Sequence, residues 1–293
     1  MIRMARDLWR VVEPYYQLTS RAPEVEAACA GIGVVRADHR YFGSRLAPVG
    51  PVSIKMAVAL LYGFAPEYVG RAVPDLWSTA SPGAMTVARL DAVAAIGRRV
   101  LGDEARGAPM AAAADLAREL VEAIDFAGRP LAAAHAGVPW SDEPAVALWQ
   151  ACAVLREHRG DGHWAATSAE DLDGVECHVL HAADGAMPAD LLQRVSGWDD
   201  DAWTAGVERL LGRGLVTRGD HGLAITDSGR AAKLRLEWAT DRSALQPLEA
   251  VGLVRAERLR QAMRPWVDRV MAADVVGAWT VREERWRDLP DPP

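Results

Sequence analysis

Apolar residues recur at helical spacing through the first 120 residues, and strand-like alternation of β-branched residues is almost absent there. The pattern predicts a helical N-terminal domain with helices over residues 23–30, 53–63, 65–76, 81–101 and 111–126. Residues 41–51 are rich in glycine, proline and serine, which predicts an irregular loop with Arg45 in its middle. Residues 102–109 are predicted to form a local linker.

A long core helix is predicted from residue 145 to about residue 159. Its apolar positions form one stripe, made of Val146, Leu148, Trp149, Cys152, Ala153 and Leu155. Gly160 and Gly162 are predicted to end this helix and to turn the chain sharply. A short helix is then expected from His163, and another over residues 169–183.

Residues 187–240 follow the order of a winged helix. A short helix over residues 187–195, a turn at Ser196 and Gly197, and a second helix over residues 199–212 form a helix-turn-helix. Two β-rich runs, at residues 215–218 and 223–226, flank a glycine-containing connection and predict a two-stranded wing. A closing helix over residues 227–241 completes the order.

The chain is predicted to end with an amphipathic helix over residues 248–263, a break at Pro265, a further helix to about Trp279 and a proline-rich tail. The resulting fold class is mainly α, with three parts. They are a helical N-terminal domain (1–143), the glycine-containing corner with the winged helix (144–241), and C-terminal amphipathic helices with the tail (242–293). The stripe of residues 248–263 fits internal packing or a homodimer surface.

Composition indicates a folded, soluble chain. The 293 residues are 50% hydrophobic and 25% charged, which disfavours disordered and collagen-like classes. Cys29, Cys152 and Cys177 cannot all pair and lack CxxC spacing, so neither a disulfide framework nor a zinc knuckle is indicated. No uncharged apolar run approaches the roughly 20 residues of a membrane span. We therefore expect a cytoplasmic protein with no membrane partner.

The charge balance argues against general nucleic-acid binding. Lys and Arg number 33 against 40 Asp and Glu, so the formal net charge of −7 repels polyanions. Residues 187–237 contain seven Arg or Lys and eight Asp or Glu, whereas a DNA-binding module normally has a basic excess. The second helix also begins with Asp199, Asp200 and Asp201, which would meet DNA with the wrong sign. DNA is a disfavoured partner that the sequence does not exclude.

The densest chemistry lies in residues 157–163, which read EHRGDGH. If a helix ends near Arg159, His158 lies at a helix C-terminus, which favours imidazolium, and His163 lies at a helix N-terminus, which favours the neutral ring. The two histidines could then divide acid and base roles, with Glu157 and Asp161 as further catalytic candidates. The alternative interpretation is that these residues are ordinary helix caps.

Several other residues are candidates for binding a small molecule. Arg159 and Arg45 could hold a polar substituent, although a salt bridge that ties down its loop explains Arg45 equally well. His135 and Trp140 lie in a segment bounded by glycine and proline and predicted to be a loop. Tyr16 could line the same pocket or could be a core aromatic residue.

The histidines allow a second, metal-binding interpretation. His158, Asp161 and His163, with His178 or His181 from the following helix, would offer ligands suited to zinc or iron. No HExxH spacing supports this divalent-metal site. Without a metal, His181 is a ligand-binding candidate, and Trp164 would supply an apolar wall suited to an aromatic ligand.

The EHRGDGH run, the LHAADG segment at residues 180–185 and the winged helix together resemble an actinobacterial family of helix-turn-helix proteins of uncharacterised function. The resemblance covers most of the chain and implies a helical domain fused to a winged helix, with EHRGDGH as the shared site. It implies no activity. The family usually has histidine where this chain has Tyr16 and asparagine where it has His135, which implies a different ligand if both positions line the pocket.

These observations support two main hypotheses and one lesser one. The favoured hypothesis is a small-molecule-binding protein, leaning towards an enzyme of specialised metabolism, in which the winged helix has become a scaffold. The alternative is a transcriptional regulator whose ligand controls how the winged helix meets DNA. A pure interaction scaffold is the third. The sequence names no substrate and no cofactor.

Overall fold

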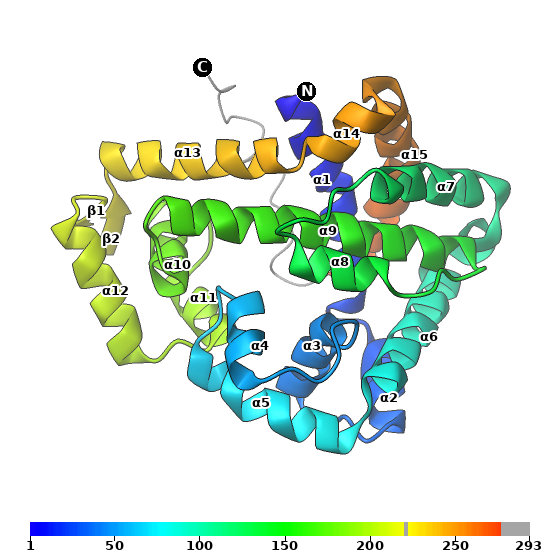
Figure 1. Cartoon of the computed structure of the whole chain (residues 1–293), viewed down its shortest axis with the longest axis horizontal. Coiled ribbons are helices and arrows are strands. Elements are labelled where there is room, and N and C mark those ends of the chain that lie inside the picture. The colour runs from blue at the N-terminus through cyan, green and yellow to red at the C-terminus, as the bar shows by residue number, and fades with distance from the viewer. Residues whose placement is uncertain (220–221, 277–293) are drawn as a thin grey trace.

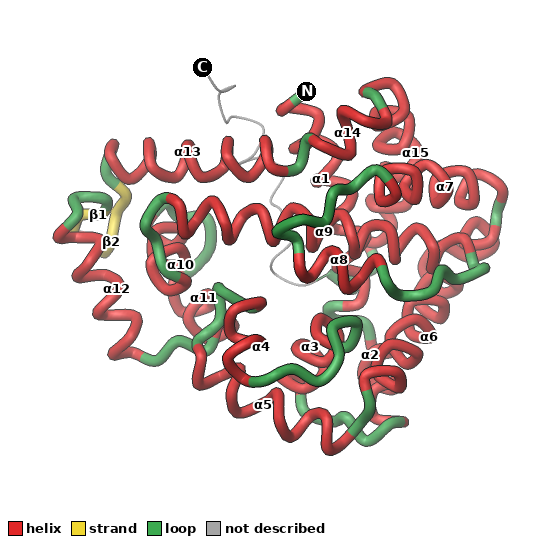
Figure 2. The backbone as a smooth tube through the Cα atoms, viewed as in Figure 1, coloured by secondary structure: helices red, strands yellow, loops and turns green. Residues whose placement is uncertain are grey.

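The computed structural model describes residues 1–219 and 222–276, and these residues are almost entirely helical (Figures 1 and 2). They form fifteen α-helices, two short 3-10 helices and one two-stranded antiparallel sheet. The prediction of a mainly α fold with a small wing is confirmed. No helix in this part of the chain is long and apolar enough to cross a membrane.

Eight helices precede the long central helix. Serine side chains begin two of them, because Ser53 and Ser81 accept hydrogen bonds from backbone amides of the following first turns. Five of the eight helices, one of them with the Ser81 cap, have proline in the first turn, where its missing N–H costs nothing. The helices are α1 (Ile2–Tyr16), α2 (Pro23–Gly31), α3 (Ala37–Leu46), α4 (Ile54–Leu60), α5 (Pro66–Thr79), α6 (Pro82–Leu101), α7 (Ala108–Glu122) and α8 (Pro130–Ala136).

The predicted loop over residues 41–51 is wrong in its first half, because α3 continues to Leu46. Phe42 and Leu46 are fully buried on this helix. A Cβ atom at Gly43 would lie 2.7 Å from the side chain of Met85, so glycine here lets α3 approach α6 closely. The burial of this face outweighs the helix-propensity cost of one glycine, about 1 kcal/mol. Arg45 therefore lies in the last turn of a helix.

The central helix α9 (Pro144–Ala169) packs against α1, α6, α7, α8 and α13 (Figure 1). The prediction that it ends near Arg159 is wrong, because it continues through Gly160 and Gly162. A Cβ atom at Gly162 would lie 2.1 Å from the Ser243 hydroxyl and 2.8 Å from the Arg129 guanidinium. Gly162 thus serves close packing, whereas a Cβ atom at Gly160 would find ordinary space. Packing against the surrounding helices stabilises α9 despite the low helix propensity of both glycines. The short helix expected from His163 is the end of α9.

The order predicted for residues 187–240 is confirmed as α11 (Ala189–Ser196), α12 (Asp200–Gly212), β1 (Val216–Gly219), β2 (Gly222–Ile225) and α13 (Asp227–Ser243). The preceding helix α10 (Gly174–Ala183) packs against α11 and α12. The turn between α11 and α12 contains Gly197 at φ +75°, a left-handed conformation that favours glycine. Strand β1 pairs with β2 so that Val216 lies opposite Ile225.

Two helices close the described chain, α14 (Gln246–Val251) and α15 (Leu253–Ala272). The predicted break at Pro265 is wrong, because α15 continues past it. Pro265 and Gln261, one turn earlier, are both exposed, so water can satisfy the carbonyl that proline leaves without a donor. Helix α15 ends at Ala272, and the last residues of the helix predicted to reach Trp279 lie outside the described part of the chain.

The described residues bury three apolar clusters. The largest joins α1, α2, α6, α7 and α9 with α14 and α15, so the first and the last described helices share one core. A second cluster joins α3, α4 and α5 with Leu131 of α8. A third lies between α10 and the winged helix. The domain boundaries at residues 143 and 241 stay predictions.

Candidate functional site

The seven residues of the EHRGDGH run do not form a corner. In an unbroken α-helix successive side chains are rotated by about 100°, so a run of seven residues points in every direction around the axis. Glu157 faces α3, Asp161 faces α8, and His163 faces α13 and α10. His158 and His163 therefore lie inside one helix, and neither is at a helix end.

The pKa shifts of the two histidines follow burial and not helix ends. Burial, reinforced by the charge of Arg129, lowers the pKa of His158 to about 4. Burial, reinforced by Arg159, lowers the pKa of His163 to about 3. The expectation that His158 favours imidazolium is wrong, because both rings are neutral near pH 7.

Glu157 is the centre of a buried ion cluster. Its two carboxylate oxygens accept hydrogen bonds from Arg45 at 3.1 and 2.7 Å, and one of them accepts another from Arg156 at 2.9 Å. Burial alone would raise the pKa of Glu157, but the two guanidinium groups outweigh it and hold the pKa well below its usual range. Arg156 also lies 3.5 Å from the carboxylate of Glu13. Arg45 thus acts as the salt-bridge partner that one of its two interpretations predicted.

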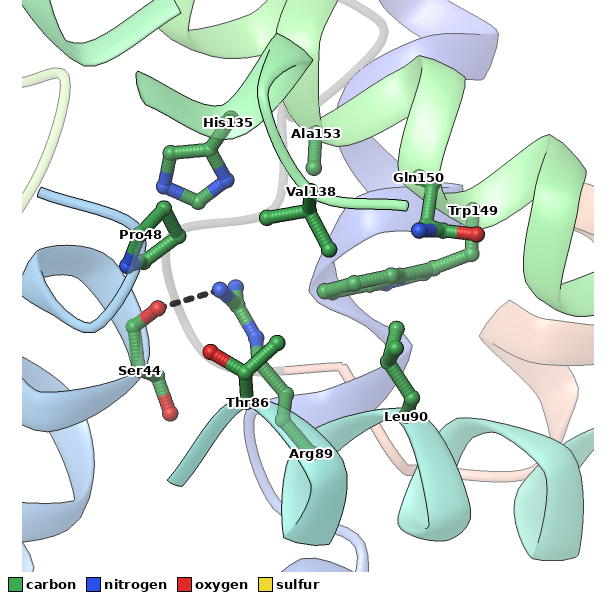
Figure 3. Close-up of a pocket in the computed structure, with 10 residues that line it drawn as sticks. All are labelled: Ser44, Pro48, Thr86, Arg89, Leu90, His135, Val138, Trp149, Gln150 and Ala153. Carbon is green, nitrogen blue, oxygen red and sulfur yellow. Dashed lines mark hydrogen bonds between the residues drawn. The ribbon is translucent and has the colours of Figure 1, made fainter. Parts of the chain in front are cut away.

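A small cavity lies beside this cluster, between α3, α6, α8 and α9 (Figure 3). We call it the Arg89 cavity. Its volume of about 20 Å³ holds about one water molecule. Figure 3 shows the guanidinium of Arg89 between Ser44 on one side and Trp149 on the other, with His135 and Val138 above it. The lining residues are Ser44, Pro48, Thr86, Arg89, Leu90, His135, Val138, Trp149, Gln150 and Ala153.

Arg89 is 6% exposed, and its contacts are neutral. It donates to the Tyr16 hydroxyl at 2.9 Å and to the Ser44 carbonyl oxygen. Its guanidinium lies 4.4 Å from the centre of the Trp149 ring and 5.4 Å from that of Tyr16, which is stacked on Trp149. Its Nε–H has no hydrogen-bond partner, and no carboxylate of the described chain lies within 4 Å of the group. Among the residues that the structure describes, Arg89 is therefore a buried cation without a counterion.

His135 lies on the opposite wall of the Arg89 cavity. It belongs to α8 and not to the predicted loop. Its Nε2 lies 3.1 Å from the Arg45 carbonyl oxygen, which can only accept, so Nε2 carries the proton and Nδ1 has the free lone pair. Burial lowers the pKa of His135 to about 4, and the ring is neutral near pH 7.

Asp161 holds the helix that carries His135. Its Oδ2 accepts hydrogen bonds from the backbone amides of Leu131 at 3.0 Å and Ala132 at 3.1 Å. These are amides of the first turn of α8, which α8 itself cannot satisfy. Burial raises the pKa of Asp161 to about 6. Asp161 is a helix cap, as the alternative interpretation held, but the helix it caps lies earlier in the chain.

The side of α9 carrying His158 and Arg159 meets α1 and α13. Arg159 donates to Asp241 at 2.8 Å and lies 4.8 Å from the ring of Trp9. Arg6 of α1 donates to the other oxygen of Asp241 at 2.8 Å. A cavity of about 30 Å³ beside these residues is lined mainly by apolar side chains of α1, α7 and α14. This network ties the closing helix of the winged helix to the N-terminal helix.

His163 and Trp164 lie in a third place, against α10. Nδ1 of His163 lies 3.1 Å from the Thr240 hydroxyl, and its Nε2 lies 4.0 Å from the sulfur of Cys177. Trp164 stacks on Tyr62 with 5.5 Å between the ring centres. His181 lies in the last turn of α10. None of these residues lines the Arg89 cavity.

Trp140 lies near the Arg89 cavity without lining it. The guanidinium of Arg118 lies 5.0 Å from its ring. The segment between α8 and α9 that contains Trp140 is fastened by Gln150, which donates to the Pro139 carbonyl at 2.8 Å and accepts from the Ser141 amide at 2.9 Å. Val138 of this segment is a wall of the cavity.

The predicted site residues thus separate into three places. Tyr16, Arg45, His135 and Glu157 gather around the Arg89 cavity, whereas His158 with Arg159 and His163 with Trp164 lie elsewhere. Within residues 1–219 and 222–276, no group of three or more His, Cys, Asp or Glu side chains is arranged to hold a metal ion. The ligand set proposed from the sequence is not brought together.

Sequence reasoning missed Arg89, although the chain carried a signal for it. Arg89 lies among Met85, Ala88, Ala92 and Val93, which are all buried on the inner face of α6. An arginine inside the apolar stripe of a predicted helix is unusual, because charged side chains are rarely buried without a partner. That position could have been marked as a candidate binding residue.

Three arginines of α12 and the wing are engaged by neighbouring carboxylates or carbonyl oxygens. On α12, Arg209 donates to Asp173 at 2.5 Å and to Glu176 at 2.9 Å, while Arg213 donates to backbone carbonyl oxygens at the end of α9 and just beyond it. Arg218 of the wing pairs with Glu208 at 2.5 Å.

The exposed side of α12 carries carboxylates. Asp200, Asp201 and Glu208 are all exposed on it, beside Thr204 and Ala205. Among the described residues, the second helix of the helix-turn-helix therefore offers acidic and small side chains where a DNA reader offers basic ones.

Comparison with curated proteins and with solved structures finds no match. A family model described as a helix-turn-helix family matches residues 5–277, which is nearly the whole chain. The match includes α1 to α15 with the winged helix and the Arg89 cavity. This chain belongs to that helix-turn-helix family.

Proposed function

We propose that this protein binds a small molecule in the Arg89 cavity and that its winged helix serves as a scaffold. The observation that carries the proposal is the buried guanidinium of Arg89, which lines a cavity and has no counterion in the described chain. Burying an unpaired charge costs several kcal/mol, which is a large fraction of the free energy of unfolding of a typical domain. An apolar side chain would suit the packing better, so a requirement for binding explains this arginine.

The cavity also supplies a group for proton transfer. His135 is neutral, and the Nδ1 atom left free by its contact with Arg45 can accept a proton from a bound molecule. An enzymatic activity at this site would use Arg89 to hold the molecule and His135 as the base. This transfers the proposed acid–base role from His158 and His163 to a histidine that lies in a cavity.

In this proposal the ligand enters beside the segment between α8 and α9. The cavity holds about one water molecule, and Val138 closes it on the side of the segment between α8 and α9. That segment is fastened to α9 through the side chain of Gln150. Displacing Val138 enlarges the cavity without separating the packed helices.

A ligand screen tests the proposal. The thermal unfolding midpoint of the wild type, Arg89→Met and Arg98→Met is measured against a library of small carboxylic acids, phosphates, amides, amino acids and aromatic compounds. Arg98 is the matched control, because it lies on the same helix and is half exposed. We expect at least one compound to stabilise the wild type and Arg98→Met but not Arg89→Met. A screen in which every compound acts equally on all three proteins would contradict the proposal.

The role of the winged helix has a separate test. The pairing of Arg209 and Arg218 with carboxylates and the exposed carboxylates of α12 support a scaffold. We expect fluorescence anisotropy with promoter DNA flanking the gene to show no binding at 150 mM salt. Binding that weakens steeply as salt increases would instead support the regulator.

A further inference from the structure

We propose that the ligand of the Arg89 cavity is a small monoanion, a carboxylate of the size of formate or acetate. The inference rests on the proposed function and adds the chemical class of the ligand. Its basis is the charge balance of the groups around the cavity, together with the hydrogen-bond donors that those groups leave free.

The cluster around the cavity contains one more cation than anions. Arg45, Arg89 and Arg156 provide three positive charges, and Glu13 and Glu157 provide two negative ones. The carboxylate of Asp161 also interacts with Arg45, but the charge of Arg129 balances it, so this second pair leaves the excess of one cation unchanged. The groups are continuous, because Arg156 lies 5.0 Å and Arg89 5.4 Å from the centre of the same Tyr16 ring. His135 is neutral near pH 7 and does not change the balance. One negative charge restores neutrality, whereas a neutral ligand leaves the excess and a dianion reverses it.

The excess charge is located at Arg89. The carboxylate of Glu157 is shared between Arg45 and Arg156, and the carboxylate of Glu13 lies beside Arg156. Arg89 receives only a hydroxyl, a carbonyl oxygen and two ring faces. A monoanion beside Arg89 would therefore meet a cation that nothing else in the described chain neutralises.

Two hydrogen-bond donors are free on Arg89 and on the Tyr16 hydroxyl beside it. The Nε–H of Arg89 has no partner. The Tyr16 hydroxyl accepts a hydrogen bond from Arg89, so its own proton is free to be donated to another acceptor. The bonds to Tyr16 and Ser44 also fix the orientation of the guanidinium plane, which reduces the entropy lost when an anion binds.

The size of the cavity selects a small ligand. A volume of about 20 Å³ extended by movement of Val138 suits a carboxylate with one or two carbons. An aromatic ligand, which Trp164 suggested in the sequence, would find the ring of Trp149 in this cavity already covered by the guanidinium of Arg89 at 4.4 Å. A small carboxylate therefore requires only a modest enlargement of the cavity, which movement of Val138 on the α8–α9 segment would provide.

Matched anions and neutral amides test the inference. The thermal unfolding midpoint is measured in sodium formate and sodium acetate, with sodium gluconate added to hold ionic strength constant. Formamide and acetamide serve as neutral ligands of similar shape. We expect formate or acetate to raise the midpoint saturably in the wild type and in Arg98→Met, with no response to either amide and none in Arg89→Met.

A second variant covers the case in which Arg89→Met does not fold. Tyr16→Phe removes one donor and keeps the ring, so we expect the affinity for the anion, measured by calorimetry, to fall about tenfold for one lost hydrogen bond to a charged group. An unchanged affinity in Tyr16→Phe, or an equal response to formate in Arg89→Met, would overturn the inference.

The inference and the proposed function can fail separately. If no anion acts on the wild type but a neutral compound of the library does so in an Arg89-dependent manner, the anion class is wrong and the binding function stands. If anions stabilise the wild type and Arg89→Met equally, they bind elsewhere, and both the anion class and the assignment of this cavity are rejected.

Discussion

Replacement by methionine should change the free energy of unfolding by very different amounts at two buried arginines of the same site. Arg45 is 4% exposed and bonds bidentately to Glu157, whereas Arg89 is 6% exposed and has no carboxylate partner. Methionine approximates the length of both side chains and carries no charge. The comparison therefore isolates the effect of the counterion at nearly constant burial.

The magnitudes follow from the partners. Arg45→Met leaves the fully buried Glu157 with Arg156 alone, and we expect a loss of about 3 kcal/mol, the lower end of the range for a broken buried pair. Arg89→Met loses two neutral hydrogen bonds worth about 1 kcal/mol each. It also loses a cation–π contact of about 1–2 kcal/mol. Removing an unpaired buried charge recovers several kcal/mol, so the net change should lie within about 1 kcal/mol of zero or be stabilising.

Urea unfolding at pH 7.5, followed by circular dichroism, measures the difference in the free energy of unfolding between the two variants. We expect Arg89→Met to be the more stable variant by about 2 kcal/mol or more. Gluconate as the only anion in the buffer prevents a small anion from stabilising the wild type. Equal losses of about 3 kcal/mol in both variants would mean that the charge of Arg89 is compensated, and would refute the reasoning behind the proposed site.

Three further predictions concern the rest of the structure. Gly162→Ala should destabilise the protein by about 1–3 kcal/mol, because the new methyl group meets Ser243. Adding Ser243→Gly should recover part of the loss. An unchanged free energy of unfolding in Gly162→Ala would show that α9 bends there. Asp161→Ala should cost about 1–2 kcal/mol in urea unfolding, since it uncaps α8, and an unchanged stability would contradict the cap. The pKa of His163 is lowered in the folded state, so between pH 7.5 and pH 5 only the unfolded state binds a proton there, and stability is lost as the pH falls below about 6.5. His163→Gln should reduce that loss by about 2 kcal/mol. An equal loss in both proteins would contradict the shift.

The candidate site was predicted only in part, for a reason visible in α9. The seven residues of the EHRGDGH run are adjacent in sequence, which suggested one corner, but an unbroken helix sends them towards α3, α8, α1 and α13. Two glycines were interpreted as a turn because glycine is poor in helices. The close contact of Gly162 with Ser243 depends on where α13 lies, and no local pattern reports that position.

Local rules determined much of this protein without any tertiary information. The sequence predicted the helical periodicity, the helix starts at serine and proline, and the order of helix, turn, helix and wing. Each of these depends on residues only a few positions apart. The sequence also showed the carboxylates at the start of α12. Tertiary structure decided which buried charges are paired. Glu157 finds Arg45 across 112 positions, and Arg159 finds Asp241 across 82, while Arg89 finds no carboxylate among the described residues. Burial makes such pairing energetically decisive, and only the packing of distant helices determines which charges meet.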